Sequence, residues 1–203
     1  MISTTKSKGM LEGKVAVITG STRGFGLVLA RVFLDAGARV VVSSRTPAAV
    51  ESALAGLNQP LRAAGMACDV GRLENVEALA AFTFSRFARL DIWVNNAGIA
   101  GPYGPALGLA PQTFTSVIQT NILGTYHGSL VALRHFLEQK HGKLINILGH
   151  GYKGPVPFQA AYSSSKIWIR SFTQSLIEEN RGSGVSIFAY NPGMMDTELL
   201  TNI

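Results

Sequence analysis

Six short apolar segments rich in β-branched residues alternate along the chain with longer segments of helical periodicity, and few folds accommodate that order. Strands are predicted at 14–19, 38–44, 65–70, 91–96, 143–148 and 185–191, and helices at 25–36, 73–89, 112–138 and 160–180. Strands of this length between helices favour a mostly parallel sheet covered by helices on both faces. The sequence therefore predicts a three-layer, doubly wound α/β fold, in which ligands bind at the carboxyl ends of the strands.

The length and composition suit one compact domain. Of the 203 residues, 47% are hydrophobic and 15% are charged, which provides enough apolar surface for a single core. We assign residues 1–12 to a flexible N-terminal segment and residues 13–203 to the domain. The first residues lack the apolar core of a signal peptide, and no later run approaches the roughly 20 apolar residues of a membrane span.

Charge and cysteine content argue against several classes of ligand. The formal charge of +6 favours an anionic partner, but the basic residues are scattered, so we expect a phosphorylated small molecule and no nucleic acid. Cys68 is the single cysteine and cannot form an internal disulfide. No cysteine or histidine pair has a metal-binding spacing, so no metal site is predicted, and a reducing, cytoplasmic location is expected.

The first predicted strand leads directly into “TGSTRGFG”, residues 19–26, and then into an apolar helix. Glycines at these positions allow a tight turn and a close approach of backbone to a diphosphate, and the helix N-terminus faces its negative charge. The position between strand and helix favours dinucleotide binding over a purely structural turn. The residues expected to contact the cofactor here are Gly20, Thr22, Arg23, Gly24, Phe25 and Gly26.

The end of the second predicted strand indicates which dinucleotide binds. It reads Ser43, Ser44, Arg45, without the carboxylate that would bond the ribose hydroxyls of NAD. Arg45 and Arg23 instead supply two guanidinium groups suited to the 2′-phosphate of NADP, and Ser44 and Thr46 add hydroxyl groups. The prediction is NADPH or NADP rather than NAD; the alternative is that both arginines are solvated surface charges.

Tyr162 and Lys166 lie four positions apart in “AAYSSSKIW”, within a predicted helix, and therefore on one helical face. A phenol with a pKa of about 10 exchanges protons poorly near neutrality, but an adjacent ammonium would lower that pKa. Such a tyrosine can donate the proton that a carbonyl oxygen needs as hydride arrives. The alternative is a buried tyrosine with a lysine stem packed along the helix.

Five motifs in sequence order resemble those of the short-chain dehydrogenase/reductase superfamily: “TGSTRGFG”, “NNAG” at 95–98, Asn121, the pair Tyr162 and Lys166, and “PGMMDT” at 192–197. The resemblance covers residues 13–203 and implies a Rossmann-type catalytic domain that transfers hydride between NADPH and a carbonyl or alcohol substrate. Asn121 then resembles the asparagine that holds a water for the proton relay. The other residues that the resemblance places along the cofactor are Asp69, Val70, Asn95, Ala97, Gly98, Pro192, Gly193 and Thr197.

One position departs from the family pattern. A serine that bonds the substrate oxygen normally lies thirteen residues before the tyrosine, and here that position is Gly149. Loss of one such donor typically costs about a hundredfold to a thousandfold in rate. Three explanations are open: His150, Ser163, a backbone N–H or a water replaces the serine; the glycine makes room for a bulky substrate; or the site is degenerate.

Chlorophyll b reductases form a branch of this family that the chain resembles in “DIWVNNAG”, “NILGHG”, “AAYSSSK” and “NPGMMDTELL”. That branch also has glycine at the serine position, which implies reduction of a formyl group on a large ring as one candidate activity. A cofactor-binding sensor or scaffold with weak catalysis is the other. The resemblance further implies a homodimer or homotetramer, and the C-terminal strand and lid of the family are apparently missing after Ile203.

Overall fold

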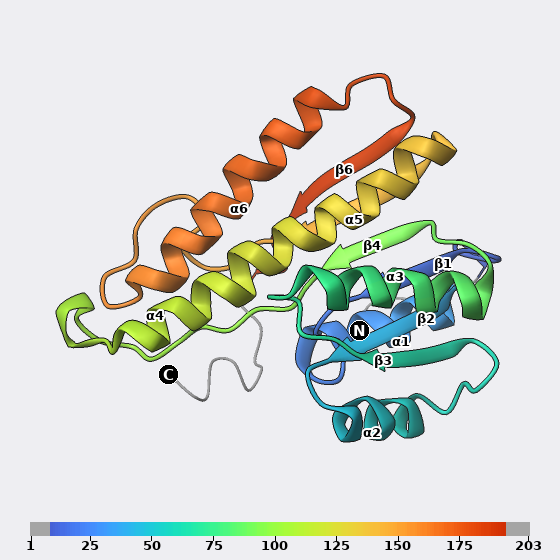
Figure 1. The fold of residues 1–203 in the computed structure, drawn as a ribbon, viewed down its shortest axis with the longest axis horizontal. Helices are drawn as coiled ribbons and strands as arrows, with labels where there is room; N and C mark the ends of the chain where they lie inside the picture. Colours follow the sequence, from blue (N-terminus) through green and yellow to red (C-terminus); the bar gives the residue numbers. More distant parts are fainter. Residues whose placement is uncertain (1–8, 194–203) are drawn as a thin grey trace.

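The computed structural model describes residues 9–193 of the chain. At its centre is a six-stranded sheet in which every pairing between described strands is parallel and the spatial order is β3-β2-β1-β4-β5-β6 (Figure 1). The strands are β1 (Val15–Ile18), β2 (Arg39–Ser44), β3 (Ala63–Ala67), β4 (Ile92–Asn95), β5 (Gly142–Ile147) and β6 (Val185–Tyr190). The chain reverses its direction of winding between β3 and β4, which opens a crevice beyond the carboxyl ends of β1 and β4. The predicted doubly wound fold is confirmed.

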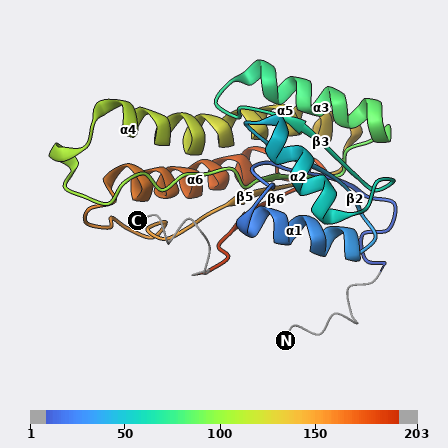
Figure 2. The ribbon, with the colours of Figure 1, turned by 90° about the horizontal axis from the view of Figure 1, so that it is seen from below.

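Helices cover both faces of this sheet, and Figure 2 shows α1 and α3 on opposite sides of it. The helices are α1 (Gly24–Asp35), α2 (Pro47–Leu57), α3 (Leu73–Phe87), η2 (Ala106–Gly108), α4 (Pro111–Val117), η3 (Ile118–Leu123), α5 (Gly124–Gln139) and α6 (Ala160–Glu179). Alternate strand residues face opposite layers: Val17 and Val41 pack with α3, α5 and α6, whereas Val40 and Val42 pack with α1 and α2. Two apolar cores therefore enclose the sheet.

Five of the six strands lie within one residue of their predicted bounds, and β3 begins two residues and ends three residues before the predicted 65–70. One helix was missed. The helix α2 connects β2 to β3 and buries Val50, Ala53 and Leu57. Its signals are present in the sequence, because Thr46 occupies the N-cap and Pro47 the first helical position. The structure also places part of the predicted flexible segment in the domain: the Leu11 N–H donates to the Ala36 carbonyl at 2.8 Å, and the Leu11 side chain packs on the core.

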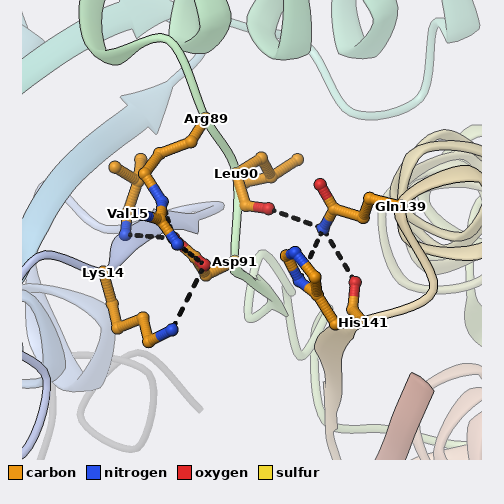
Figure 3. A network of polar contacts seen from close by, with 7 residues as sticks. All are labelled: Lys14, Val15, Arg89, Leu90, Asp91, Gln139 and His141. Carbon is orange, nitrogen blue, oxygen red and sulfur yellow. Dashed lines mark hydrogen bonds and ion pairs between the residues drawn. The ribbon is translucent and has the colours of Figure 1, made fainter. Parts of the chain in front are cut away.

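A buried carboxylate, that of Asp91, joins β1 and β4 at the amino-terminal ends of the strands, opposite the crevice (Figure 3). We call this end of the sheet the amino edge and the opposite end, where the strands finish, the carboxyl edge. Asp91 accepts two hydrogen bonds from the Arg89 guanidinium, at 2.6 and 2.8 Å, and one from the Val15 N–H at 2.9 Å. The Lys14 ammonium lies 3.6 Å away. Burial alone would raise the pKa of Asp91, but these hydrogen bonds and charges outweigh it and hold the pKa below its usual range.

Residues 9–193 contain neither a membrane-spanning helix nor a metal-binding cluster. None of the helices in this range combines the length and the apolar character needed to cross a bilayer. The same residues contain no cluster of three or more histidine, cysteine, aspartate or glutamate side chains that could hold a metal ion. Burial raises the pKa of the Cys68 thiol to about 12, with a smaller contribution from Asp69, so this cysteine is unreactive.

Candidate active site

The glycine-rich turn after β1 is held in a compact form that suits a diphosphate. Gly20 has a φ of 61°, and a Cβ there would lie 2.7 Å from the Ala97 Cα. A Cβ at Gly26 would lie 2.6 Å from the Gly20 carbonyl oxygen and 2.8 Å from the Ser21 Cα. Only glycine fits at either position, so the turn has the close packing between backbone segments that the dinucleotide motif requires. The residues present fit a dinucleotide cofactor.

Two polar side chains that the sequence analysis missed hold this turn against β4. The Asn96 amide donates to the carbonyls of Thr19 and Gly20, at 2.8 and 3.0 Å. The Thr19 hydroxyl accepts hydrogen bonds from the N–H groups of Asn96 and Ala97, both at 3.1 Å. These contacts fix the first turn relative to the “NNAG” segment. The signal available in the sequence was the second asparagine of that motif, for which no role was predicted.

The residues predicted at the adenosine end of the cofactor lie at the ends of β2 and β3. Ser44 ends β2 and its hydroxyl donates to the Thr46 carbonyl at 3.3 Å, while Arg45 is exposed. Arg23, at the N-cap of α1, is also exposed. Asp69 is exposed and accepts a hydrogen bond from the Gly71 N–H at 3.0 Å, whereas the neighbouring Val70 is buried. The NADP preference remains a prediction from these charges.

The predicted place of Asn95 along the cofactor stays a prediction, and the structure shows what its side chain does. It is buried and makes its hydrogen bonds inside the protein, accepting from the Trp93 indole at 2.8 Å and donating to Asn146 at 2.8 Å and Ser129 at 3.1 Å. A Cβ at Gly128 would overlap the Asn95 amide oxygen, so α5 can approach only because that residue is glycine. The amide therefore joins β4 to β5 and α5, and only the main chain of Asn95 is left for a ribose.

Tyr162 and Lys166 come together as predicted, on the inward face of α6. They are 8% and 5% exposed, and the Lys166 Nζ lies 5.5 Å from the centre of the Tyr162 ring. The ammonium donates a hydrogen bond to the Ile147 carbonyl at the end of β5, at 3.2 Å. Nearby, a Cβ at Gly98 would lie 3.4 Å from the Asn121 amide oxygen and 3.7 Å from Nζ. The carboxyl ends of β4 and β5 thus meet at these side chains.

The pKa shifts of this pair differ from the sequence expectation. Burial raises the pKa of the Tyr162 phenol, whereas we predicted that the lysine would lower it. Burial also lowers the pKa of Lys166 to about 8, because a buried ammonium is poorly solvated. Desolvation is the cause of both shifts. At neutral pH the phenol is therefore protonated, which is the form that donates a proton.

Asn121 lies in the π-helical turn η3, which interrupts the long helix predicted at 112–138. Figure 1 shows α4 and α5 as one long run beside α6, with this turn at their junction. The Asn121 amide accepts from the Ile99 N–H at 2.9 Å and donates to the Ile99 carbonyl and the Ser165 hydroxyl, both at 3.0 Å. The side chain thus fixes the loop after β4, and widened turns of this kind are frequent at functional sites.

The space beside the Gly149 Cα is filled by the Tyr162 side chain. A Cβ at this position would overlap the Tyr162 hydroxyl oxygen and would lie 3.2 Å from the Lys166 Cε. The phenol therefore fills the volume in which a serine side chain would begin. Of the four proposed replacements for the serine, the two side chains are engaged elsewhere: His150 is exposed, and the Ser163 hydroxyl donates back to the Gln159 carbonyl at 3.0 Å.

The last predicted cofactor segment is only partly within the described range. Pro192 and Gly193 follow β6, and the Gly193 N–H donates to the Asn191 side chain at 3.2 Å. Thr197, also predicted to contact the cofactor, lies outside the described residues.

The parallel sheet, the glycine turn and the buried tyrosine–lysine pair together define an α/β oxidoreductase that binds a dinucleotide. The chain belongs to the short-chain dehydrogenase family, whose model matches residues 14–203. The family resemblance predicted from the five motifs is confirmed.

Comparison with known proteins supports the same assignment. A probable chlorophyll(ide) b reductase of Oryza sativa subsp. japonica is 34% identical over 91% of this chain and 40% of its own length. A second chlorophyll(ide) b reductase of that organism is 37% identical over 91% of this chain and 56% of its own length. The chain thus spans about half the length of these relatives, and the predicted likeness to their branch is confirmed.

Solved structures of the family contain the expected class of cofactor. The 3-ketoacyl-(acyl-carrier-protein) reductase from Brucella melitensis, complexed with NADH, superposes with a TM-score of 0.90 at 32% identity, over 95% of this chain and 81% of that chain. The closed form of a serine dehydrogenase complexed with NADP+ gives 0.85 at 26% identity, over 91% and 74%. A nicotinamide dinucleotide is therefore the cofactor class, and the two structures differ in which one they hold.

Proposed function

We propose that this protein reduces the carbonyl group of a small molecule with NADPH, using Tyr162 as the proton donor. The observation that supports this most directly is the position of the Tyr162 hydroxyl against Gly149, at the end of β5 and beside Lys166. The bound cofactor supplies the hydride. Because burial raises the pKa of Tyr162, the phenol stays protonated at neutral pH and can neutralise the oxygen on which negative charge develops.

Lys166 and Asn121 support this proton transfer in different ways. The Lys166 ammonium, with a pKa near 8, is largely charged at pH 7 and stabilises negative charge on the tyrosine once its proton has left. We propose that it would also hold the ribose hydroxyls of the cofactor, since it lies beside Gly98. Asn121 holds the loop at Ile99 and thereby keeps Gly98 next to the ammonium. We propose that a water held near Asn121 returns the proton from solvent.

Replacement of Tyr162 tests the function. We expect Tyr162→Phe to lower the rate of NADPH oxidation with aryl aldehydes by about 10²–10⁴-fold, because the general acid is lost. Cofactor binding, followed by protein-to-cofactor fluorescence transfer, should be unchanged. Tyr152→Phe, in the loop that precedes α6, is the matched control and should retain activity. Undiminished turnover by Tyr162→Phe would contradict the proposal, and NADPH binding without turnover of any aldehyde would favour the sensor.

The preference for NADPH is proposed from Arg45 and Arg23, both exposed beyond the first two strands. We expect Arg45→Ala to weaken NADPH binding about tenfold while NADH binding is unchanged, since only NADPH carries the 2′-phosphate. Arg31→Ala, an exposed arginine on α1, is the control. Equal loss for both cofactors, or no loss for either, would remove the basis for the preference.

A formyl group on a large ring is the second candidate substrate, because two similar relatives carry the name chlorophyll(ide) b reductase. Gly149 does not provide extra room for such a ring in this conformation, since the Tyr162 hydroxyl takes up that space. Turnover of a formyl tetrapyrrole in preference to small aryl aldehydes would select this candidate. The reverse preference would exclude it.

We also propose that the protein forms a homo-oligomer through α5 and α6. Tyr126 of α5 is 41% exposed and its ring lies 6.1 Å from that of Phe172 on α6, which in turn stacks on Trp168 at 4.6 Å. Partly exposed aromatic side chains on two adjacent helices are typical of subunit interfaces. Sedimentation analysis of Tyr126→Glu, expected to shift the protein toward monomer, tests this.

A further inference from the structure

A narrow cavity lies directly beside Tyr162, between the loop after β4, the helix α4 and the start of α6. Its volume is about 10 Å³, enough for roughly one water-sized group. Most of its wall is apolar, formed by Ala100, Pro102, Leu109, Phe114, Val117 and Ala161. A substrate ring cannot enter this space, but one small substituent of a substrate can.

Gln159 contributes a buried polar group to this wall. Its side-chain oxygen Oε1 is buried and has no hydrogen-bond partner among the described residues. Gln159 occupies the N-cap of α6, yet its side chain makes no capping hydrogen bond. Its main chain is fully used, since the N–H donates to Val156 and the carbonyl accepts from Ser163. An unpaired buried amide oxygen is costly, and this one belongs to a residue that lines a cavity at the active site, which indicates a ligand contact.

The segment before Gln159 holds the amide in this place. Phe158 has a φ of 64°, a left-handed conformation that non-glycine residues adopt at a cost of about 1 kcal/mol or more. Its carbonyl accepts a hydrogen bond from the Gly104 N–H at 2.9 Å, and its ring lies 5.4 Å from the Tyr103 ring. The two loops at the mouth of the site are thus joined, and together they impose the conformation that directs Gln159.

We propose that Gln159 and this cavity form a subsite for one small hydrogen-bond donor of the substrate, a hydroxyl or amino group. The donor binds Oε1 while the reacting carbonyl faces the Tyr162 hydroxyl. Gln159 and Tyr162 are three residues apart, about 5 Å along the helix axis, and both line the cavity, so we place the donor at about this distance from the reacting carbonyl. The substrate class is therefore a carbonyl compound with a hydroxyl or amino group at that spacing, and this part of the inference rests on the proposed reduction.

Three aldehydes that differ in one substituent test the subsite: benzaldehyde, 3-hydroxybenzaldehyde and 3-methoxybenzaldehyde. The wild-type protein should favour the hydroxyl compound over benzaldehyde by about tenfold or more in kcat/KM, and should discriminate against the methoxy compound, which lacks the donor and is too large. Gln159→Met, with similar length but no amide, should remove that preference while benzaldehyde turnover changes by less than about threefold. Gln174→Met, an exposed glutamine later on α6, is the control.

Two further variants separate recognition from folding. Gln159→Glu keeps an acceptor oxygen at a helix N-terminus and should retain the preference for the hydroxyl compound. Gln159→Leu supplies a second apolar side chain if the methionine variant does not fold. A hydroxyl preference that survives both apolar replacements would overturn the proposal.

Binding of 3-hydroxybenzyl alcohol and benzyl alcohol in the presence of NADP+, measured by calorimetry, gives a readout that needs no turnover. If hydroxyl-dependent binding is lost in Gln159→Met but no aldehyde is reduced by any variant, the subsite holds and the proposed reduction fails. If both alcohols bind alike to the wild-type protein, the subsite is refuted even where reduction is observed.

Discussion

The amino edge and the carboxyl edge of the sheet each bury one charged side chain, but only the one at the amino edge is paired with opposite charges. At the amino edge, Asp91 is 5% exposed and has a bidentate arginine, a lysine and a backbone N–H around it. At the carboxyl edge, Lys166 is also 5% exposed, but its one hydrogen bond goes to a neutral carbonyl, and no carboxylate in residues 9–193 pairs with it. Both pKa values are lowered, which favours the charge of Asp91 and disfavours that of Lys166.

This difference separates a structural ion from a functional one. The pairing of Asp91 compensates for its desolvation and joins two neighbouring strands, so the group contributes to stability. The Lys166 ammonium remains available to interact with the tyrosine and with a ligand, and the folded state is less stable for it. The Gln159 amide oxygen, which is buried and has no partner within residues 9–193, belongs to the same edge. Uncompensated polar groups therefore gather where ligands bind.

Replacement of Lys166 should produce the largest change and should move activity and stability in opposite directions. We expect Lys166→Met to lower kcat by about 10³-fold, equivalent to about 4 kcal/mol, because the phenolate loses its cation. The same change should increase the free energy of unfolding at pH 7 by about 1–2 kcal/mol. Removal of the desolvation penalty, about 3 kcal/mol for this shift, is partly offset by the lost hydrogen bond to Ile147.

The pH dependence gives this prediction its control. The folded pKa of Lys166, about 8, lies below the ordinary lysine value of about 10.4, so folding penalises the protonated form. Below pH 8 both folded and unfolded chains carry the proton, and the penalty is complete. As pH rises from 8 to about 10.4 the folded state loses the proton first and the penalty fades. The stability gain of Lys166→Met, from urea unfolding, should therefore vanish over that range; a constant gain would point to packing instead.

Replacement of Asp91 should act at the other edge and in the opposite sense. We expect Asp91→Ala to lower the free energy of unfolding by about 2–3 kcal/mol, because the buried Val15 N–H loses its acceptor and the arginine loses its partner. The contribution of the cations is reduced by their exposure, 44% for Arg89 and 48% for Lys14. The kcat of the folded variant should be unchanged, because the substitution lies at the edge of the sheet away from the site.

Acid titration and a milder variant check the Asp91 prediction. The lowered pKa means that the carboxylate contributes its full stability above about pH 4 and loses it as pH falls through the folded pKa. The difference between wild type and Asp91→Ala should therefore shrink below about pH 4. Asp91→Asn keeps an acceptor for Val15 and should cost less than alanine. A clear loss of kcat in the folded Asp91→Ala variant would show that the two edges are not independent.

The fold could be predicted because each strand carries its own local signal, whereas much of the site depends on tertiary contacts. The strands were placed within three residues at every end. The π-helical turn at Asn121 was predicted as continuous helix, because it arises where the Asn121 amide binds Ile99 in another loop. Burial depth is likewise absent from a spacing pattern. For this reason the direction of the Tyr162 pKa shift was predicted wrongly.

One difference was accessible from the sequence. Asn95 follows Trp93 by two residues, and alternate residues of a strand face the same side of the sheet. The indole is buried against α5, and the Asn95 side chain faces α5 as well. The glycines at 20 and 26 show the opposite case, in which a local motif correctly indicated a close backbone approach. Local patterns thus predict backbone geometry better than the partners of a buried polar side chain.

Replacement of Gly149, at the carboxyl edge beside Tyr162, should have the smallest of these effects. A side chain there would overlap the Tyr162 hydroxyl, so Gly149→Ala should displace the phenol and lower kcat by about 10–100-fold, with NADPH affinity nearly unchanged. Gly154→Ala is the matched control, because it lies in the following loop and a Cβ there has no atom within 4 Å. Equal kcat values in the two variants would mean that the phenol moves freely, and that the glycine serves the substrate instead.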